Sequence, residues 1–385
     1  MSGKRRDHQG RVLRTGESQR SDGRYMYRYT GSKGKRGCIY EMSLERLRQR
    51  EDDIKRDTLD GIDTLGGEMT VEELVKRYIN LKRGWKENTR RGYETSFKRI
   101  QSTSLSDQDI NHVKLSDAKT WCVMMHDQGY SRSTIEGMQC LLRPAFEMAV
   151  EDDLVRKNPF RFKLCTLLPN DAVPRVALTA EQQDQYLRFV REYGGDLYYD
   201  DIVILLGTGL RVSERYGLTK ADIDFEGRCI HICKQLCRTS DMPYFITEPK
   251  TKTGIRTIPM TDTVFMAFKR VLANRPKHKV ETIVDGCGGF IFLDKDKKPR
   301  VGMHLQNYMR LLREHHPWAL GGSFPTVTPH VLRHTFCTNM VRLGIDVKSL
   351  QYLMGHSSAS VTLDVYTHTD YSAVKEAFDR AVGDR

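Results

Sequence analysis

A histidine and an arginine lie three residues apart at the expected start of a helix near the C-terminus. Thr328 is a suitable N-cap and Pro329 a suitable first helical residue, so His330 and Arg333 fall in the first turn and on one face of the helix. Free backbone N–H groups and the helix dipole make that turn favourable for an anion such as a phosphate. His330 and His334 also have the i, i+4 spacing of zinc ligands, but no glutamate follows His330, so the zinc-protease pattern is absent.

A second arginine and a lysine could act on the same phosphate. Arg211 follows an apolar helix that is expected to end at residues 207–209. Two arginines suit a phosphodiester, because nucleophilic attack places negative charge on both of its non-bridging oxygens. Residues 249–258 are interpreted as a hairpin with Lys252 near its turn, where the ammonium group could protonate a leaving 5′-oxygen.

A glycine-histidine pair and a tyrosine complete the candidate set. Gly355 and His356 are expected to end one helix, and Tyr366 lies ten residues beyond His356 in another short helix. Physical chemistry alone does not rank Tyr366 above Tyr352 or Tyr371, because an isolated tyrosine usually serves packing. The order and spacing of the whole set carry the specificity.

Taken together, these residues resemble the tyrosine recombinase (phage integrase) family in order and spacing. The matching positions are Arg211 in Thr-Gly-Leu-Arg-Val-Ser-Glu, Lys252, His330 and Arg333 in His-x-x-Arg, His356 after Gly355, and Tyr366. The resemblance covers nearly the whole chain, and the short motifs at residues 4–7, 15–20, 22–25 and 335–339 look like those of integrases of conjugative transposons. Met354 stands where the family usually has leucine, which is a volume-conserving difference.

The resemblance implies DNA cleavage and religation through a covalent intermediate. Tyr366 is expected to attack the scissile phosphate, giving a 3′-phosphotyrosine and a free 5′-hydroxyl. The other roles that the resemblance implies are a clamp on the non-bridging oxygens for Arg211 and Arg333, general acid for Lys252, proton transfer at the tyrosine for His330, and a hydrogen bond to the phosphate for His356. No cofactor and no metal are expected, since the covalent link conserves the phosphodiester energy and the cationic side chains stand in for a metal.

The same resemblance implies partners. They are double-stranded DNA (transposon ends, arm sites and target), three further copies of the chain in a tetramer that acts through a Holliday junction, and a small excisionase. The helix expected after Tyr366 would pack onto a neighbouring protomer, the alternative being a helix packed on its own domain.

Three other functions remain open from the sequence. A type IB topoisomerase uses similar arginine, lysine, histidine and tyrosine chemistry, but the N-terminal basic module weighs against it. A Xer-type resolvase of the same family would normally lack residues 1–66. A non-catalytic DNA-architectural protein would have lost catalytic residues, and none is missing here.

The chain is expected to be a multidomain, mainly α-helical protein with small β elements. Residues 1–66 are predicted to form a small β-sheet plus helix that binds arm-type DNA, the alternative being a disordered basic arm. Residues 67–166 are predicted to be an all-α core-binding domain, and residues 175–385 a mixed α/β catalytic domain. Within the helical domain, the residues predicted to cap the starts of three helices are Thr70 with Glu73, Asn88-Thr89, and Ser131. Residues 60–67 and 159–174 are interpreted as linkers.

The distribution of charge favours a polyanionic partner. The net charge is +12, with residues 1–36 holding eleven Lys and Arg against three acidic residues and residues 76–99 holding nine against two. Charge gathered into such stretches indicates nucleic acid first and a membrane surface second. The residues predicted to contact DNA are Arg24, Arg28, Lys86, Asn88, Thr89, Arg90 and Arg132.

The nine cysteines are expected to be reduced thiols. They include no Cys-x-x-Cys pair, and an odd count without a secretory signal argues against a disulfide framework. Cys229, Cys233 and Cys237 with His231 suggest zinc, but the expected strand over residues 228–233 spaces them unlike a zinc knuckle, so no metal is predicted. The mean hydropathy of −0.55 and the lack of a long apolar run predict a soluble, cytoplasmic protein.

Overall fold

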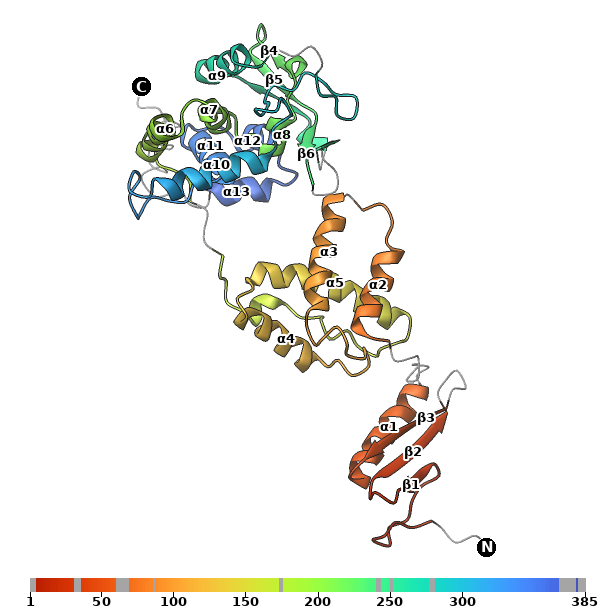
Figure 1. Cartoon of the computed structure of the whole chain (residues 1–385). Coiled ribbons are helices and arrows are strands. Elements are labelled where there is room, and N and C mark those ends of the chain that lie inside the picture. Colours follow the sequence, from red (N-terminus) through yellow and green to blue (C-terminus); the bar gives the residue numbers. More distant parts are fainter. Residues whose placement is uncertain are drawn as a thin grey trace. The chain divides into compact units, whose positions relative to one another are not determined.

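The computed structural model describes residues 5–30, 36–59, 69–85, 87–172, 176–239, 244–249, 252–276, 281–366 and 379, without the side chains of residues 57, 252 and 364–366. Contacts within the chain define two compact units, Met1–Val173 and Pro174–Arg385. Figure 1 shows the elements coloured in chain order. The predicted fold class, mainly helical with small antiparallel sheets, is confirmed.

The chain begins with a three-stranded antiparallel sheet and one helix. The strands are β1 (Glu17–Gln19), β2 (Tyr25–Thr30) and β3 (Arg36–Glu41), in the order β1-β2-β3, and helix α1 (Leu44–Leu59) follows. Alternate side chains of β2 point to opposite faces, so Tyr25 and Tyr27 are buried with Leu47 of α1 while Arg28 is exposed. The predicted sheet-plus-helix module is therefore present.

The next part of the chain is helical around one apolar core. Its elements are α2 (Val71–Leu81), α3 (Glu87–Gln101), α4 (Leu115–Asp127), α5 (Arg132–Glu151) and the 3-10 turn η1 (Leu164–Thr166). Thr70 and Glu73 form the capping box expected for α2, and the Ser131 hydroxyl accepts a hydrogen bond at the start of α5. The predicted linker over residues 159–174 is wrong at its start, because Phe160, Leu164 and Leu168 are buried in this core.

The second unit surrounds a larger core with helices and two small sheets. Its helices are α6 (Ala180–Gly194), α7 (Tyr199–Thr208), α8 (Val212–Tyr216), α9 (Asp262–Ala273), α10 (Gly302–His315), α11 (Pro329–Arg342), α12 (Val347–Met354) and α13 (Ala359–Tyr366), with 3-10 turns η2 (Lys220–Asp222) and η3 (Lys252–Gly254). Its strands are β4 (Ile223–Asp224), β5 (Cys229–Ile232), β6 (Gln235–Cys237), β7 (Phe245–Thr247) and β8 (Arg256–Pro259). Helix α7 packs between α9 and α11, and its buried residues Ile202 and Leu205 share the core with Phe268 and Leu332.

The strand order corrects the hairpin predicted over residues 249–258. Strand β8 pairs with β5 in the sheet β4-β5-β8, whereas β7 pairs with β6 in a separate sheet. Lys252 therefore begins a 3-10 turn ahead of β8 rather than lying in a two-stranded hairpin. The local pattern predicted a turn and a strand correctly but assigned the strand the wrong partner, because pairing depends on residues far away in the sequence.

In the part of the chain that the structure describes, no helix is both long enough and apolar enough to cross a membrane.

Candidate active site

Three arginines from different elements converge on the C-terminal end of α12. The last turn of a helix leaves carbonyl oxygens without intrahelical partners, and here the consecutive carbonyls of residues 353–355 accept side-chain hydrogen bonds. Arg256 Nε donates to the first carbonyl over 2.7 Å, Arg333 Nη2 to the second over 2.5 Å, and Arg211 Nη2 to the third over 2.9 Å. The negative end of the helix dipole favours this gathering of cations.

A buried carboxylate joins two of these arginines. Arg211 is the N-cap of α8, and Glu214 follows three residues later with one carboxylate oxygen 2.6 Å from Arg211 Nη1. The other oxygen lies 2.9 Å from Arg256 Nη2, and the side chains of Glu214 and Arg256 are both fully buried. Burial raises the pKa of Glu214, but the hydrogen bond and charge of Arg256 and the charge of Arg211 together lower it below its ordinary value.

Arg333 has a different environment. Its Nη1 donates to Gly209 O over 2.6 Å, and the residue is 8% exposed. Among the described residues, no carboxylate lies within ion-pair distance of its guanidinium group. Burial and the nearby charge of Arg211 lower the pKa of Arg333 to about 9. A buried cation without a counterion is costly, so an anion bound beside it would be strongly stabilised.

Two glycines allow the backbone to approach these groups. Gly209 ends α7 and Gly355 ends α12, both in the left-handed region with φ of 62° and 61°. A Cβ atom on Gly355 would lie 2.9 Å from Arg256 Nη1, and one on Gly209 would lie 2.3 Å from a ring carbon of Phe336. Both glycines are thus required by the turn and by close packing, Gly355 against Arg256 and Gly209 against Phe336.

His356 follows directly after the arginine-bound carbonyls. Its Nδ1 lies 3.0 Å from the hydroxyl of Thr362 on α13, which is buried. Burial first, and then the charges of Arg333 and Arg211, lower the pKa of His356 to about 4. The imidazole is therefore neutral at physiological pH, and a phosphate that neutralised the arginines would raise its pKa.

For two of the remaining predicted catalytic residues, the structure describes the backbone but not the side chain. His330 is the second residue of α11 and is exposed, with Thr328 and Pro329 at the predicted N-cap and first helical positions. Lys252 begins η3, and Tyr366 ends α13, a helix that packs against α11 and α12. The structure thus brings Arg211, Arg333 and His356 together, whereas the side chains of Lys252 and Tyr366 lie outside the described residues.

The alternative tyrosines are distinguished in part. The hydroxyl of Tyr352 accepts the backbone N–H of Thr257 over 3.0 Å, so it already has a structural role at β8. Tyr371 lies outside the described residues.

Sequence reasoning did not identify Glu214, Arg256 or Thr362 as part of the site. A signal existed for Arg256, because it shares the buried face of β8 with Ile258, where a charged residue needs a partner. Glu214 was visible only as the acidic residue three positions after Arg211. Thr362 offered no signal, because a threonine within a helix is common and its partner is six residues away.

The residues predicted to contact DNA in the N-terminal module are exposed. Arg28 projects from β2 on the face opposite the tyrosine core, and Arg24 precedes β2. The Arg24 guanidinium lies 2.7 Å from the carboxylate of Asp22 and 5.9 Å from the ring centre of Tyr40. An exposed ion pair of this kind contributes little stability, so a DNA phosphate could replace Asp22 at small cost.

In the helical part, three of the residues predicted to contact phosphate lie in the first turns of α3. Helix α3 begins at Glu87, so Asn88 and Thr89 are its second and third residues and not the predicted cap, and both are exposed with Arg90. Arg90 contacts Glu87 and Glu94.

Arg132 and Lys86 are the other two residues of the helical part that were predicted to contact DNA. The backbone N–H of Arg132, at the start of α5, donates to the carboxylate of Asp171 over 2.8 Å, so an anion already occupies that helix end. Lys86 lies outside the described residues.

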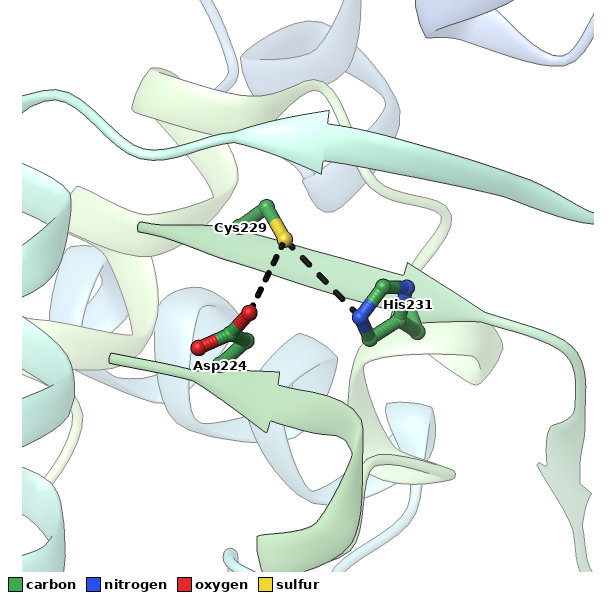
Figure 2. Close-up of side chains that lie close together, drawn as sticks. All are labelled: Asp224, Cys229 and His231. Atoms are coloured by element: carbon green, nitrogen blue, oxygen red, sulfur yellow. Dashed lines mark hydrogen bonds between the residues drawn. The ribbon is translucent and has the colours of Figure 1, made fainter. Parts of the chain in front are cut away.

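One group of side chains in the described part of the chain has metal-binding chemistry. It consists of Asp224, Cys229 and His231, on β4 and β5 (Figure 2).

Two parts of the chain match known protein families. Residues 177–373 match the phage integrase family, and residues 1–58 match the DNA-binding domain of Tn916 integrase. The transposase from transposon Tn916 of Enterococcus faecalis is 39% identical over 394 aligned positions, which cover 99% of this chain and 97% of that protein.

Solved structures give the same picture. The Tn1549 transposon integrase in complex with transposon right end DNA is 39% identical, with a TM-score of 0.76 over 82% of this chain and all of that one. A lambda integrase dimer bound to a COC′ core site is 17% identical, with a TM-score of 0.59 over 94% of this chain and 97% of that one, which is a likeness of fold alone.

Proposed function

This chain belongs to the phage integrase family of tyrosine recombinases, and we propose that it is the integrase of a conjugative transposon, which integrates and excises that element by cutting and rejoining DNA. The observation that carries the proposal is the convergence of Arg211, Arg256 and Arg333 on the end of α12, where Glu214 is the one carboxylate paired with them among the described residues. This excess of positive charge, with Arg256 and Arg333 buried and Arg211 partly buried, suits a phosphodiester. The relatives support the substrate, since the solved transposon integrases are bound to transposon DNA or a circular intermediate of it.

The chemistry is a transfer of the phosphoryl group between oxygens. The Tyr366 hydroxyl oxygen forms a bond to the scissile phosphorus, the bond to the 5′-oxygen breaks, and a 3′-phosphotyrosine and a 5′-hydroxyl result. His330 takes part in removing the tyrosyl proton, and Lys252 protonates the leaving oxygen. Attack by a 5′-hydroxyl from the partner duplex reverses the step and completes strand exchange.

Negative charge increases on the non-bridging oxygens in the transition state, and the guanidinium groups of the arginines are already oriented to stabilise it. Arg211 and Arg333 would donate hydrogen bonds to these oxygens. Hydrogen bonds to backbone carbonyls already fix both guanidinium groups in place, so little reorganisation is needed during the reaction. His356, neutral and oriented by Thr362, would add a hydrogen bond. Glu214 and Arg256 position Arg211 and do not touch the phosphate.

Each of the three proposed domains has a different role on DNA. Residues 1–66 bind arm sites through the exposed sheet face that carries Arg28, residues 67–166 bind the core site, and residues 175–385 cut it. The match of residues 1–58 to a DNA-binding domain supports the first assignment. Lys86, Asn88, Thr89, Arg90 and Arg132 remain proposed contacts of the second domain.

The active form is a tetramer on two duplexes that exchanges strands in pairs through a Holliday junction. Lambda integrase has been solved both as a dimer on a core site and as a tetramer on a Holliday junction, in agreement with such an assembly. The C-terminal tail would dock on the next protomer, and an excisionase would bias the reaction towards excision. The protein would act in the bacterial cytoplasm, where the chromosome lies.

A recombination assay tests the function. Purified protein is mixed with a plasmid that carries joined transposon ends and with a target plasmid, and recombinant joints are sequenced. The wild type should give joints at the transposon ends. Tyr366→Phe should bind the same DNA and give none. Relaxation of a supercoiled plasmid without the ends, in the absence of joints, would instead indicate a topoisomerase, and equal activity of Tyr366→Phe would contradict the proposal.

A further inference from the structure

The short hairpin formed by β4 and β5 places an aspartate, a cysteine and a histidine on one face. In the antiparallel register Asp224 lies opposite Cys229. Cys229 and His231 are two residues apart on β5, so their side chains point to the same side, while Ile230 and Ile232 point into the core. Figure 2 shows the three side chains turned toward one another.

The distances between the donor atoms suit a single metal ion. Cys229 Sγ lies 3.8 Å from His231 Nε2 and 3.9 Å from Asp224 Oδ2, and all three atoms lie within 4.8 Å of one another. Tetrahedral zinc, with bonds of about 2.3 Å to sulfur and about 2.0 Å to nitrogen or oxygen, requires sulfur to lie about 3.6 Å from the other donors. Both sulfur distances are therefore within a few tenths of an ångström of this value. The histidine nitrogen and the aspartate oxygen, which lie within 4.8 Å of each other, would have to come to about 3.3 Å around the metal.

Neighbouring groups hold the histidine and the aspartate in position. The Nδ1 atom of His231 lies 3.1 Å from the hydroxyl of Thr257, its partner across the β5–β8 pair, which leaves Nε2 facing the sulfur. The backbone N–H of Gly227 donates to Asp224 Oδ1 over 2.8 Å, which leaves Oδ2 facing the sulfur. A second hydrogen bond of this kind is characteristic of metal-binding histidines and carboxylates.

Gly227 also makes room for the carboxylate. A Cβ atom at this position would lie 2.4 Å from Asp224 Oδ2, the oxygen that faces Cys229. A side chain at position 227 would displace that oxygen from its place beside the sulfur.

We propose that Asp224, Cys229 and His231 form a zinc site with water as the fourth ligand, a metal clip between β4 and β5 that takes no part in DNA cleavage. Thiolate, imidazole and carboxylate together favour Zn²⁺ over Mg²⁺ or Ca²⁺, which prefer oxygen ligands alone. The site is independent of the proposed recombinase chemistry, so either can fail without the other.

The other two cysteines of this region do not belong to the site. Cys233 Sγ lies 3.8 Å from Asp222, whose carboxylate is already paired with the ammonium group of Lys234. Cys237 lies beside Thr247 on the β6–β7 sheet. Cys233 is thus a matched control, a cysteine next to an aspartate without a histidine.

The test uses the full chain, stripped of metal and kept reduced. Zn²⁺ binding is measured by competition with a chromophoric chelator, and Co²⁺ is added separately to detect thiolate-to-metal charge transfer. The wild type should bind one equivalent that Cys229→Ser and His231→Ala lose and that Cys233→Ser keeps. Thr257→Val should weaken binding roughly tenfold to a hundredfold through loss of the orienting hydrogen bond.

A measurement on the wild type guards against variants that fail to fold. Zn²⁺ should slow alkylation of Cys229, followed by mass spectrometry, without slowing that of the exposed residues Cys38 and Cys233. Equal alkylation rates of Cys229 with and without Zn²⁺, or unchanged stoichiometry in Cys229→Ser, would overturn the proposal. Covalent DNA cleavage in a chelator should be unaffected by removal of this zinc.

Discussion

At the residue scale, the arginine cluster determines the protonation of His356. The pKa of this histidine lies at about 4, well below the ordinary value of about 6.5, because of burial and the charges of Arg333 and Arg211. Titration of histidine-labelled protein by NMR, with His356→Asn to assign the signal, should give that low pKa without DNA and a higher one with DNA bound. A pKa near 6.5 in free protein would contradict the proposed electrostatics.

The same shift has a consequence for stability. A histidine whose folded-state pKa is lowered contributes stability that is present above about pH 6.5 and is lost as the pH falls through about 4, because the unfolded state binds the proton more readily. Chemical denaturation across that window should show a shallower acid loss for His356→Asn than for the wild type. Parallel curves for the two proteins would show that His356 is not the group responsible.

Among the described residues, Glu214 is the carboxylate that pairs with Arg211 and Arg256 of the site, so its removal should cost more than that of an ordinary ion pair. We expect Glu214→Gln to lower the free energy of unfolding by about 3 kcal/mol, since one partner of a buried pair is left uncompensated. DNA cleavage should fall at temperatures where the variant is still folded. The control is Glu314→Gln, which removes an exposed ion pair with Arg310 on α10 and should cost under about 1 kcal/mol. Equal losses in the two variants would contradict this account.

At the element scale, the end of α12 is the feature on which the site is assembled. Gly355→Ala adds a side chain at a φ of 61° and directs it at the Arg256 guanidinium, so both stability and cleavage should decrease. Gly321→Ala has a similar φ of 74° with nothing within 4 Å of the new atom, so it should lower stability by about 1 kcal/mol and leave cleavage unchanged. Denaturation and covalent cleavage assays on both variants separate backbone strain from displacement of Arg256.

Elements specified by local chemistry were predictable from the sequence, and those specified by distant contacts were not. The caps at Thr70, Ser131 and Thr328 are chemical signals within a few residues, and the structure confirms each of them. The pairing of β8 with β5 joins residues more than twenty positions apart, and the burial of Phe160 depends on its packing against the helices that carry Trp121 and Phe146; both were predicted wrongly.

The site shows the same division. Arg211, Arg333 and His356 were identified by motif resemblance. The strand pattern offered a signal for Arg256 but not its partners, and Thr362 became visible only through its partner in space. The metal-type cluster was missed in part because Asp224 joins Cys229 only across the hairpin.

At the scale of the whole molecule, the C-terminal tail is the segment proposed to link protomers. Deletion of residues 372–385 should leave binding of one protomer to a half-site intact and reduce cooperative assembly on a full site. Gel shift and analytical ultracentrifugation on matched half-site and full-site DNA measure the two effects. Unchanged cooperativity would mean that the tail packs on its own domain.

The central claim, that Tyr366 becomes covalently joined to DNA, is tested most directly with a nicked suicide substrate carrying a transposon end. The reaction contains a chelator, and the adduct that resists denaturation is mapped by mass spectrometry. We predict a 3′-phosphotyrosine at Tyr366 that is absent in Tyr366→Phe and retained in Tyr352→Phe. An adduct at Tyr371 or Tyr352, or none at all despite tight binding of the wild type to the same DNA, would contradict the assignment.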